Sequence, residues 1–467
     1  MQRQSTNFIT LPTWPISMST NDIKVSICGI GYVGLCLAAG LAKKGYRVIC
    51  VDVDEERIAQ VAAGKAPIFE PQLEEFLSEG VEAGLLTATL DIKEAVMGSD
   101  ITFLCVGTPC DDTGYIDLKY IREVSKELGE VLKEKEDFHV LSVKSTVIPG
   151  TTDGVVKPIV EEYSGKTAGV DFGLAMTPEF LKEGSAIADM MEPDKTVIGA
   201  LDDASREKLE LLFSVFPGAV VTCDLRSAEM IKYANNSFLA TKISFINEIA
   251  NMCEKFGADS TIVARAIGLD VRIGPKFLMA GCGFGGSCFP KDVKALYSAA
   301  KEAGYDSKIL KATLAVNEVQ PLRVVDALQN LLGDLSGKKI AILGLAFKPD
   351  TDDMREAPVI KIVNELLEQG AQVVATDPVA IPNAQKILGD KISFASEISD
   401  ALAGADAAAI VTEWAQFKAL SPDDFLQAMN SPVVVDGRKI YDPKVMLGAG
   451  VKYFQIGYSQ DCSFVPK

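Results

Sequence analysis

The chain has 467 residues, of which 48% are hydrophobic and 24% charged, a composition typical of a well-packed globular protein with two or three domains. Its formal net charge of −18 argues against a nucleic-acid partner, because phosphate backbones bind basic surfaces. No apolar stretch is long and uncharged enough to predict a membrane span. The ten cysteines are irregularly spaced and form no CxxC pair, which favours a reducing, cytoplasmic compartment over a zinc site or a disulfide scaffold.

Residues 1–22 are polar, contain prolines and lack the apolar core of a secretory signal, so we expect a flexible leader. The single histidine, His139, lies in the apolar run 138–143, where we expect a buried imidazole. Any acid–base chemistry must therefore use carboxylates, lysine, cysteine or water. For the same reason a histidine-based metal site is not expected, and no other metal site is predicted.

Two arrays of alternating strands and helices make up most of the chain. In the first array we predict strands at residues 24–28, 47–53, 100–106, 138–143, 170–176, 196–200 and 218–222. The same pattern starts again near Ser336, with strands predicted at 338–343, 372–377, 406–412 and 432–436. Alternation of this kind predicts an α/β fold built on doubly wound parallel sheets.

Between the two arrays, residues 227–256 contain no Gly or Pro and predict one long helix. Its apolar residues cover more than one face, so the helix needs burial against both domains or against another subunit. We therefore expect a helix that joins the domains and also contributes to a dimer.

Residues 28–35 read CGIGYVGL and directly follow the end of the first predicted strand. Glycines spaced as GxGxxG permit a tight turn, let a pyrophosphate approach the backbone and let the next helix pack closely on the strand. Asp52 follows the second strand, where a carboxylate binds the ribose hydroxyls and repels a 2′-phosphate, so NAD is favoured over NADP even with Arg57 nearby. The residues expected at this site are Gly29, Gly31, Tyr32, Val33, Gly34, Asp52 and Arg57.

Two further loops end predicted strands at the edge where doubly wound sheets bind their ligands. The first holds Gly107, Thr108 and Pro109, and the second holds Thr146. Either loop could be an ordinary turn, but both lie where we expect the cofactor.

The segment 281–294, GCGFGGSCFPKDVK, is the most informative in the chain. A glycine-rich loop leads into a helix whose first turn is predicted to contain Pro290. Cys288 would then lie at the helix N-terminus with Lys291 nearby, and both features favour the thiolate, the reactive form of cysteine. Cys288 is therefore the candidate nucleophile among the ten cysteines.

The run 283–292, GFGGSCFPKD, resembles the signature of the UDP-glucose/GDP-mannose dehydrogenase family, and the resemblance extends from Lys24 to about Phe454. It implies two Rossmann-like domains joined by a long central helix: an NAD-binding domain at 23–225, a central helical dimerisation and catalytic-loop domain at 226–330, and a UDP-sugar-binding domain at 331–467. It also implies oxidation of a primary alcohol to a carboxylate with two NAD⁺, through a thiohemiacetal and a thioester on the cysteine.

The resemblance assigns catalytic roles to Cys288, Lys232, Asn236, Asp292, Glu179 and Thr146. Lys232 and Asn236, one helical turn apart, match the pair that stabilises developing oxyanions. Asp292 and Thr146 match positions that organise the water and its proton transfers. Glu179 matches the base of thioester hydrolysis.

By the same resemblance, further residues hold the cofactor and the sugar nucleotide. The additional NAD contacts are Glu183 (near the nicotinamide), Lys291 and Arg355. The expected substrate contacts are Glu179, Phe180, Leu181, Lys182, Lys232, Asn236, Arg272, Phe277, Leu278, Phe284, Gly285, Phe347, Lys348 and Arg438. Arg272 is expected to act across a homodimer or higher homo-oligomer, in the neighbouring subunit's site. Phe347, Lys348 and Arg438 are expected to contact UDP.

Several residues bear on which sugar nucleotide is used. Thr177 and Met279 depart from residues common in relatives, whereas Phe289 and the run 182–186 favour UDP-glucose over GDP-mannose. Ser287 stands where N-acetylhexosamine enzymes usually carry His. The leading hypothesis is C6 oxidation of UDP-glucose to UDP-glucuronate, with GDP-mannose or another nucleotide sugar as the alternative substrate. A two-electron hydroxyacid dehydrogenase and a catalytically silent binding protein are the remaining hypotheses.

Overall fold

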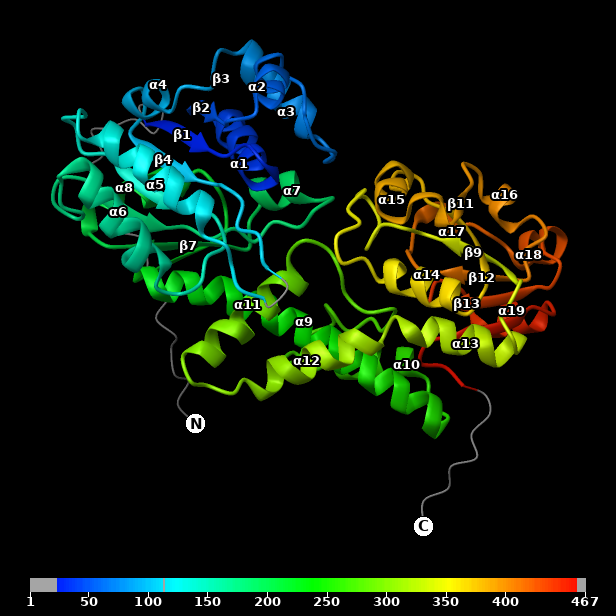
Figure 1. Ribbon diagram of the computed structural model, residues 1–467. Helices are drawn as coiled ribbons and strands as arrows, with labels where there is room; N and C mark the ends of the chain where they lie inside the picture. Colours follow the sequence, from blue (N-terminus) through cyan, green and yellow to red (C-terminus); the bar gives the residue numbers. More distant parts are fainter. Residues whose placement is uncertain (1–22, 112–113, 460–467) are drawn as a thin grey trace.

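The computed structural model describes residues 23–111 and 114–459, and the expected leader at 1–22 lies outside them. Two α/β domains lie side by side, and the long helix α9 (Leu225–Phe256) runs beneath them and joins them (Figure 1). The predicted α/β architecture, two sheets with one long helix between them, is confirmed.

The first domain contains an eight-stranded sheet in the order β3-β2-β1-β4-β5-β6-β7-β8. Its strands are β1 (Lys24–Cys28), β2 (Arg47–Val51), β3 (Leu86–Thr89), β4 (Ile101–Leu104), β5 (Val140–Val143), β6 (Gly173–Met176), β7 (Lys195–Ala200) and β8 (Ala219–Cys223). Neighbouring strands are parallel except β6 and β7, so the predicted parallel sheet is confirmed apart from this one antiparallel pair. The segment between these two strands carries a long loop and only the short helix α7 (Ala186–Met191) instead of a full crossover helix, and the chain re-enters the sheet in the opposite direction.

The second domain contains a wholly parallel sheet in the order β11-β10-β9-β12-β13-β14. Its strands are β9 (Lys339–Leu343), β10 (Gln372–Thr376), β11 (Ser393–Phe394), β12 (Ala407–Ile410), β13 (Val433–Asp436) and β14 (Lys452–Gln455). Both sheets reverse their strand order beside their first strand, which creates the crevice where such domains bind ligands. Strands β3, β11 and β14 were not predicted, because edge strands are paired on one side only and need no long apolar run.

Helices cover both sheets and fill the region between the domains (Figure 1). In the first domain they are α1 (Tyr32–Lys43), α2 (Glu55–Ala62), α3 (Leu73–Glu82), α4 (Ile92–Met97), α5 (Lys119–Leu132), α6 (Lys157–Ser164), α7 and α8 (Asp203–Phe213). In the second they are α13 (Leu322–Leu332), α14 (Pro358–Glu368), α15 (Ile381–Leu388), α16 (Ile398–Leu402), α17 (Ala415–Lys418), α18 (Pro422–Ala428) and α19 (Pro443–Gly448). Three central helices pack on α9: α10 (Ser260–Gly268), α11 (Phe289–Glu302) and α12 (Lys308–Val319). Within the described residues, no helix is long and apolar enough to cross a membrane.

Helix α9 confirms the predicted long helix and begins two residues before it. Asp224 caps its N-terminus by accepting a hydrogen bond from the Ser227 amide at 2.9 Å. One face of α9 is buried, but Phe238 and Phe245 remain exposed. Exposed aromatic side chains on one helix are typical of an interaction surface.

The single histidine is a structural residue, as predicted. His139 is fully buried, and its ring is hydrogen-bonded to the Thr102 hydroxyl at 2.7 Å and to the Ser99 carbonyl oxygen at 3.1 Å. Burial lowers the pKa of His139 to about 3, so the imidazole is neutral.

Candidate active site

The glycine-rich turn after β1 has the shape that a dinucleotide pyrophosphate requires. Gly29 has a φ of 92°, and a Cβ there would lie 2.9 Å from the backbone of Cys105. A Cβ at Gly34 would lie 2.0 Å from the Gly29 carbonyl oxygen, so α1 could not pack on the turn with a larger residue. Gly31 faces open space where α1 begins at Tyr32, which leaves the amide end of the helix accessible to a phosphate.

Asp52 follows β2, beside the glycine-rich turn. Its Oδ2 accepts a hydrogen bond from the Ile30 amide at 2.8 Å, and its Oδ1 accepts one from the Asp54 amide at 3.1 Å. The carboxylate is thus held at the carboxyl edge of the sheet, where the ribose of NAD would meet it. Arg57 pairs with Asp54 at 3.4 Å, and Val33 is half-buried in the first turn of α1.

The two other loops predicted at this edge meet each other. The Thr108 hydroxyl donates to the Thr146 carbonyl oxygen at 3.0 Å. Gly107 and Pro109, on either side of Thr108, are exposed. Both loops follow the carboxyl ends of neighbouring strands, β4 and β5, so they border the same crevice as the glycine-rich turn.

Cys288 is the N-cap residue of α11, as predicted, and two buried polar pairs lie near it. Lys232 Nζ donates to Glu179 Oε1 at 2.7 Å, and Asn236 Nδ2 donates to Asp292 Oδ2 at 2.7 Å. Lys232 and Asn236 come from α9, Asp292 comes from α11, and Glu179 follows β6. The structure therefore brings together these five predicted catalytic residues, which we call the catalytic cluster, from three separate parts of the chain.

The thiolate expected at Cys288 is not favoured by this environment. Burial, and then Glu179, raise the pKa of Cys288 to about 11, although Lys232 acts in the opposite direction. Lys291, which was expected to favour the thiolate, instead donates to Asp292 Oδ1 at 2.6 Å, where its charge is neutralised. The prediction of a depressed thiol pKa was therefore wrong, because desolvation outweighs the helix N-terminus at an enclosed site.

Lys232 and Glu179 hold each other in the charged state. Burial by itself acts to neutralise both groups, but their mutual attraction raises the pKa of Lys232 and lowers that of Glu179. The Leu181 amide also donates to Glu179 Oε2 at 2.6 Å. A charged ammonium close to Cys288 suits the stabilisation of a developing oxyanion.

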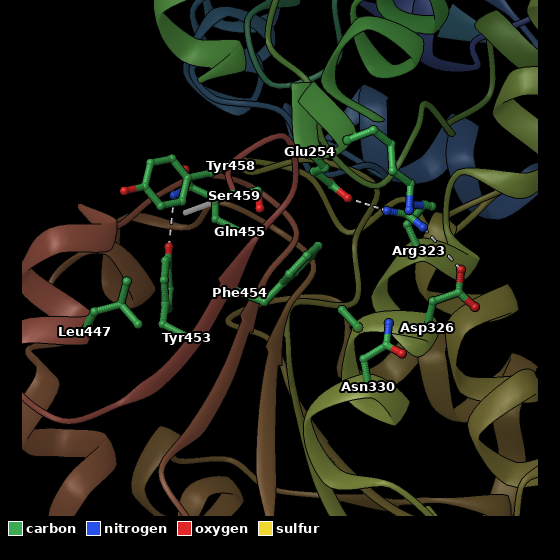
Figure 2. A pocket seen from close by; sticks show the side chains of 12 residues that line it. Glu254, Arg323, Asp326, Asn330, Leu447, Tyr453, Phe454, Gln455, Tyr458 and Ser459 are labelled. Carbon is green, nitrogen blue, oxygen red and sulfur yellow. Dashed lines mark hydrogen bonds and ion pairs between the residues drawn. The ribbon is translucent and has the colours of Figure 1, made fainter. Parts of the chain in front are cut away.

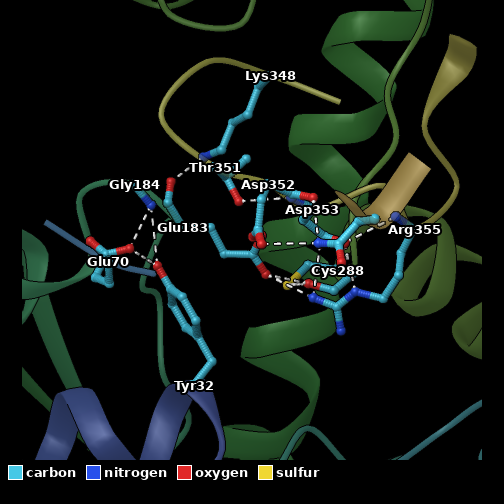
Figure 3. A network of polar contacts seen from close by, with 12 residues as sticks. Tyr32, Glu70, Glu183, Gly184, Cys288, Lys348, Thr351, Asp352, Asp353 and Arg355 are labelled. Carbon is cyan, nitrogen blue, oxygen red and sulfur yellow. Dashed lines mark hydrogen bonds and ion pairs between the residues drawn. The ribbon is translucent and has the colours of Figure 1, made fainter. Parts of the chain in front are cut away.

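Glu183 connects the first domain to the catalytic loop (residues 281–288) and to the second domain (Figure 3). Its Oε1 accepts hydrogen bonds from the Ser287 hydroxyl at 2.7 Å and from Arg355 at 3.2 Å, and Lys348 donates to its backbone carbonyl oxygen. Burial, and then the neighbouring Asp353 carboxylate, raise the pKa of Glu183 to about 7. The charge of Glu183 therefore changes near neutral pH, at the contact between the domains.

A residue behind Glu183 was not predicted. Glu70 is buried, and its carboxylate accepts hydrogen bonds from the amides of Gly184 and Ala186, both at 2.7 Å, and from the Tyr32 hydroxyl. It thereby ties the loop that carries Glu183 to the glycine-rich turn (Figure 3). No local motif marks Glu70, because its partners come from distant parts of the chain.

Comparison with known proteins identifies the family. Residues 23–217 match the NAD binding domain of the UDP-glucose/GDP-mannose dehydrogenase family, residues 226–319 its central domain, and residues 341–443 its UDP binding domain. The chain belongs to this family. Its cofactor is NAD, and the glycine-rich turn and Asp52 fit that dinucleotide.

Relatives and solved structures in the UDP-glucose/GDP-mannose dehydrogenase family resemble the chain over nearly its whole length. It is 47% identical over 423 residues to the UDP-glucose 6-dehydrogenase AglM of Haloferax volcanii, covering 90% of this chain and 97% of that relative. It is 43% identical over 434 residues to the UDP-glucose 6-dehydrogenase TuaD of Bacillus subtilis, covering 93% of each. The structure of a UDP-glucose dehydrogenase from Pyrobaculum islandicum matches with a TM-score of 0.89 at 38% identity, covering 95% of this chain and 100% of that one.

In this member of the family, the second domain touches the catalytic loop directly. The ring of Phe347 lies against Gly286, whose amide donates to the Arg355 carbonyl oxygen at 2.8 Å. Arg438 donates to the carbonyl oxygens of Phe347 at 3.0 Å and Val411 at 2.5 Å. Two of the predicted UDP contacts, Phe347 and Arg438, are therefore joined by a hydrogen bond beside the catalytic loop.

The aromatic residues predicted to contact the sugar nucleotide pack around the start of α11. The rings of Phe277 and Phe284 both contact Phe289, with centroids 6.0 and 6.1 Å away. Leu278 and Gly285 are buried. The structure thus brings these residues to the helix that begins at the candidate nucleophile.

Other predicted substrate residues divide between the catalytic cluster and the surface. The Phe180 ring centroid lies 5.5 Å from Lys232 Nζ. Lys182 is exposed and pairs with Asp189 at 2.7 Å. The Arg272 side chain is 85% exposed and pairs with Asp270 in its own loop, so Arg272 does not join the catalytic cluster of its own chain.

A separate cavity of about 350 Å³ lies at the end of α9, beside α13 and β14 (Figure 2). Arg323 in its wall pairs with Glu254 and, at 3.5 Å, with Asp326, so its positive charge is already balanced by the protein. None of the predicted site residues lines this cavity, and we assign it no part in the chemistry.

Proposed function

We propose that this chain is an NAD-dependent UDP-glucose 6-dehydrogenase, which oxidises the C6 alcohol of UDP-glucose to the carboxylate of UDP-glucuronate. The observation that carries the proposal is the enclosed cluster in which Cys288 lies near the Lys232–Glu179 ion pair. A two-electron hydroxyacid dehydrogenase needs no such thiol, whereas a second oxidation, at the aldehyde level, needs a nucleophile. The relatives at 47% and 43% identity, both named UDP-glucose 6-dehydrogenase, support the substrate.

The two oxidations use the same cluster. NAD, when bound, accepts the hydride in each oxidation. We assign Lys232 and Asn236 to stabilising the oxyanion that forms at C6. Cys288 adds to the aldehyde to give a thiohemiacetal, and oxidation of that adduct gives a thioester.

Cleavage of the thioester needs an activated water. We assign Glu179 as the base that takes a proton from this water, since the carboxylate is kept charged by Lys232. Asp292 and Thr146 are the groups assigned to organising the water and its proton transfers. Asp292 is held in place by Asn236 and Lys291.

A protonated thiol suits the first covalent step. When a thiol adds to an aldehyde, the proton of the S–H group ends on the new hydroxyl, and no net proton transfer to the protein is required. The raised pKa of Cys288 is therefore compatible with the reaction. Lys232 stabilises the thiolate as it forms, because it acts to lower that pKa.

We assign the remaining predicted residues to ligand binding by domain. Residues 23–225 are the proposed NAD domain, 226–330 the central domain and 331–467 the UDP-sugar domain. The proposed NAD contacts beyond the glycine-rich turn and Asp52 are Gly107, Thr108, Pro109, Glu183, Lys291 and Arg355. The proposed sugar-nucleotide contacts are Phe180, Leu181, Lys182, Phe277, Leu278, Phe284, Gly285, Phe347, Lys348 and Arg438.

We further propose a homodimer built on α9. The exposed rings of Phe238 and Phe245 support this surface, and the exposed Arg272 is the residue we assign to the neighbouring subunit's site. The nine cysteines that the structure describes are all free, which supports a reducing, cytoplasmic location.

The test is the amount of NADH formed per sugar nucleotide. The purified chain is given a limiting amount of UDP-glucose, and in parallel GDP-mannose and UDP-N-acetylhexosamines. We expect two NADH per UDP-glucose and little turnover of the others. One NADH per substrate would instead indicate a two-electron dehydrogenase, and binding without NADH formation would indicate a silent binding protein.

The covalent step is tested with Cys288→Ser. We expect carboxylate formation to be lost while NAD⁺ binding, measured by calorimetry, stays within about twofold of the unmodified chain, because the thiol is not needed to bind the dinucleotide. Full turnover by this variant would rule out the thioester route.

A further inference from the structure

The proposed reaction releases protons into an enclosed site. Oxidising a primary alcohol to a carboxylate consumes two NAD⁺ and one water and yields two NADH and three protons. Lys232, Asn236 and Asp292 are buried, and the single histidine is bonded elsewhere, to Thr102. A proton taken up among these buried groups therefore needs a neighbouring group or water to carry it to solvent.

A cavity of about 200 Å³ offers such a route. Glu179 and Phe180 line it, whereas Cys288, Lys232 and Asn236 do not. A polar cavity of this size is large enough to hold water molecules. Glu179 therefore borders both the catalytic cluster, through its bond to Lys232, and a space that can hold water.

Lys144, the residue after β5, lines the same cavity. It is only 7% exposed, yet its Nζ makes no hydrogen bond or ion pair in the part of the chain that the structure describes. This Nζ lies over two aromatic rings, with the ring centroids of Phe213 at 5.3 Å and of Phe103 at 6.0 Å. An amine that lines a cavity and makes no hydrogen bond to the described residues is open to water there, so it can exchange a proton with water in the cavity.

Lys135, in the same domain, is a buried lysine whose amine has ordinary hydrogen-bond partners. It is 6% exposed, and its Nζ donates to two backbone carbonyl oxygens, at 3.0 and 3.2 Å. The two lysines have similar exposed fractions, but Lys135 is hydrogen-bonded to the backbone, whereas Lys144 lines the cavity that Glu179 also lines. Lys135 is therefore a matched control.

The surrounding charges set the proton affinity of Lys144. Burial lowers its pKa to about 8, Cys105 and Glu179 act against that fall, and Lys232 adds to it. The charged residues at the cavity wall besides Glu179 are Lys182, Asp189, Glu192, Asp194, Lys195 and Lys276. Lys144 therefore exchanges its proton near neutral pH, which an ordinary lysine does not do.

We propose that Lys144 and this cavity form the proton exit of the reaction. The proposal rests on the assigned role of Glu179 as the base. As the water oxygen bonds to the thioester carbon, Glu179 takes the water proton and passes it through cavity water to the neutral amine of Lys144, which releases it to solvent. The C–S bond then breaks, and the Cys288 sulfur takes the proton of the carboxylic acid, which leaves the product as a carboxylate.

The first experiment compares the pH dependence of kcat in the unmodified chain, Lys144→Met and Lys144→Arg. Because the amine must be neutral to accept a proton, kcat of the unmodified chain should rise with pH through about 8. Both variants should lose this step and fall in kcat by on the order of 100-fold, with KM for NAD⁺ and UDP-glucose little changed. Arginine keeps the positive charge but does not deprotonate. If Lys144 acts only through its charge, Lys144→Arg should keep the kcat of the unmodified chain, and that result would overturn the proposal.

The second experiment is chemical rescue. Adding methylamine to Lys144→Ala should restore kcat in proportion to the free base, because the small amine can occupy the cavity and accept the proton. Lys135→Met should lower the unfolding temperature but keep the pH step of the unmodified chain. A Lys144→Met enzyme that retains the step, or a Lys144→Ala enzyme that methylamine does not rescue, contradicts the proposal.

The proposed function and the proposed proton exit are tested by different measurements. NADH stoichiometry is measured first on the unmodified chain, so a wrong assignment of the reaction appears there, before any variant is made. If that chain yields two NADH per UDP-glucose, the Lys144 variants test the proton exit alone.

Discussion

Cys288 occupies the N-cap position of α11, where a helix N-terminus and a nearby lysine would be expected to stabilise a thiolate. A helix N-terminus contributes about 0.3–2 kcal/mol to such a charge. The rise of the thiol pKa from 9.0 to about 11 corresponds to roughly 3 kcal/mol in the other direction. Burial and the Glu179 carboxylate therefore decide the protonation state, and the cysteine is a neutral thiol until it reacts.

Alkylation at Cys288 tests this directly. We expect iodoacetamide to react slowly with Cys288 at pH 7 and about tenfold faster for each unit of pH up to about 11, because only the thiolate is nucleophilic. Glu179→Gln removes a negative charge near the sulfur and should speed the reaction at pH 8. Rates are measured by mass spectrometry of the peptide that contains Cys288. Fast alkylation that does not change between pH 6 and pH 9 would mean that the thiolate is already present.

At the scale of elements, the loop between β6 and α7 carries two carboxylates with different partners. If this loop were a helix, Glu179 and Glu183 would lie one turn apart on one face, but the structure shows no helix there. Glu179 instead joins Lys232 on α9, and Glu183 joins Ser287 and the second domain. The irregular loop allows the two side chains to reach different elements, which a helix would not permit.

The Glu183 contact makes stability depend on pH. The folded-state pKa of Glu183 is raised from an ordinary value of 4.5 to about 7. The protonated carboxyl therefore adds to the free energy of unfolding fully below pH 4.5, and this contribution is lost as pH rises through 7. We expect the unfolding temperature to fall over this range, and Glu183→Gln, which carries no proton to lose, to flatten that part of the curve. Glu136→Gln, at an exposed site, is the control and should keep the full slope. An unchanged slope in Glu183→Gln would show that the carboxyl titrates normally.

At the scale of the whole molecule, the site is assembled from both domains and the helix between them. Phe347, Arg355 and Arg438 from the second domain contact the catalytic loop or each other through backbone groups. Arg272 remains outside this assembly in its own chain, and Phe238 and Phe245 on α9 are exposed. Both features are compatible with the proposed dimer, in which Arg272 serves the neighbouring subunit's site.

Mixed dimers test whether Arg272 acts across the interface. Arg272→Ala and Cys288→Ser should each be nearly inactive alone. If Arg272 serves the neighbouring site, unfolding and refolding the two variants together should restore about a quarter of normal activity, because half of the random dimers have one intact site. Mixing without subunit exchange is the control. No recovery in verified heterodimers would show that Arg272 acts within its own chain or not at all.

Much of the site was predictable because its parts have local signatures. The GxGxxG turn requires small residues at fixed spacing, and Asp52 follows the next strand, so backbone geometry fixes both from sequence alone. The position of Cys288 followed from the glycine loop and Pro290. Glu70 and Lys144 have no such signature. Glu70 is defined by its bonds to amides distant in sequence, and Lys144 by the cavity that it lines without a hydrogen bond from its amine to any described residue.

The sequence by itself determined the inner strands of both sheets, the long helix α9, where the dinucleotide turn lies and which cysteine begins a helix, since these depend on contacts between near neighbours in the chain. Only the tertiary structure decided the direction of β7, the neutral state of the Cys288 thiol and the partners of Glu183. These features depend on burial and on charges from elements far apart in sequence. Which residues bury a group, and which charges lie near it, depend on how distant parts of the chain pack together. No local pattern of residues therefore determines these three features.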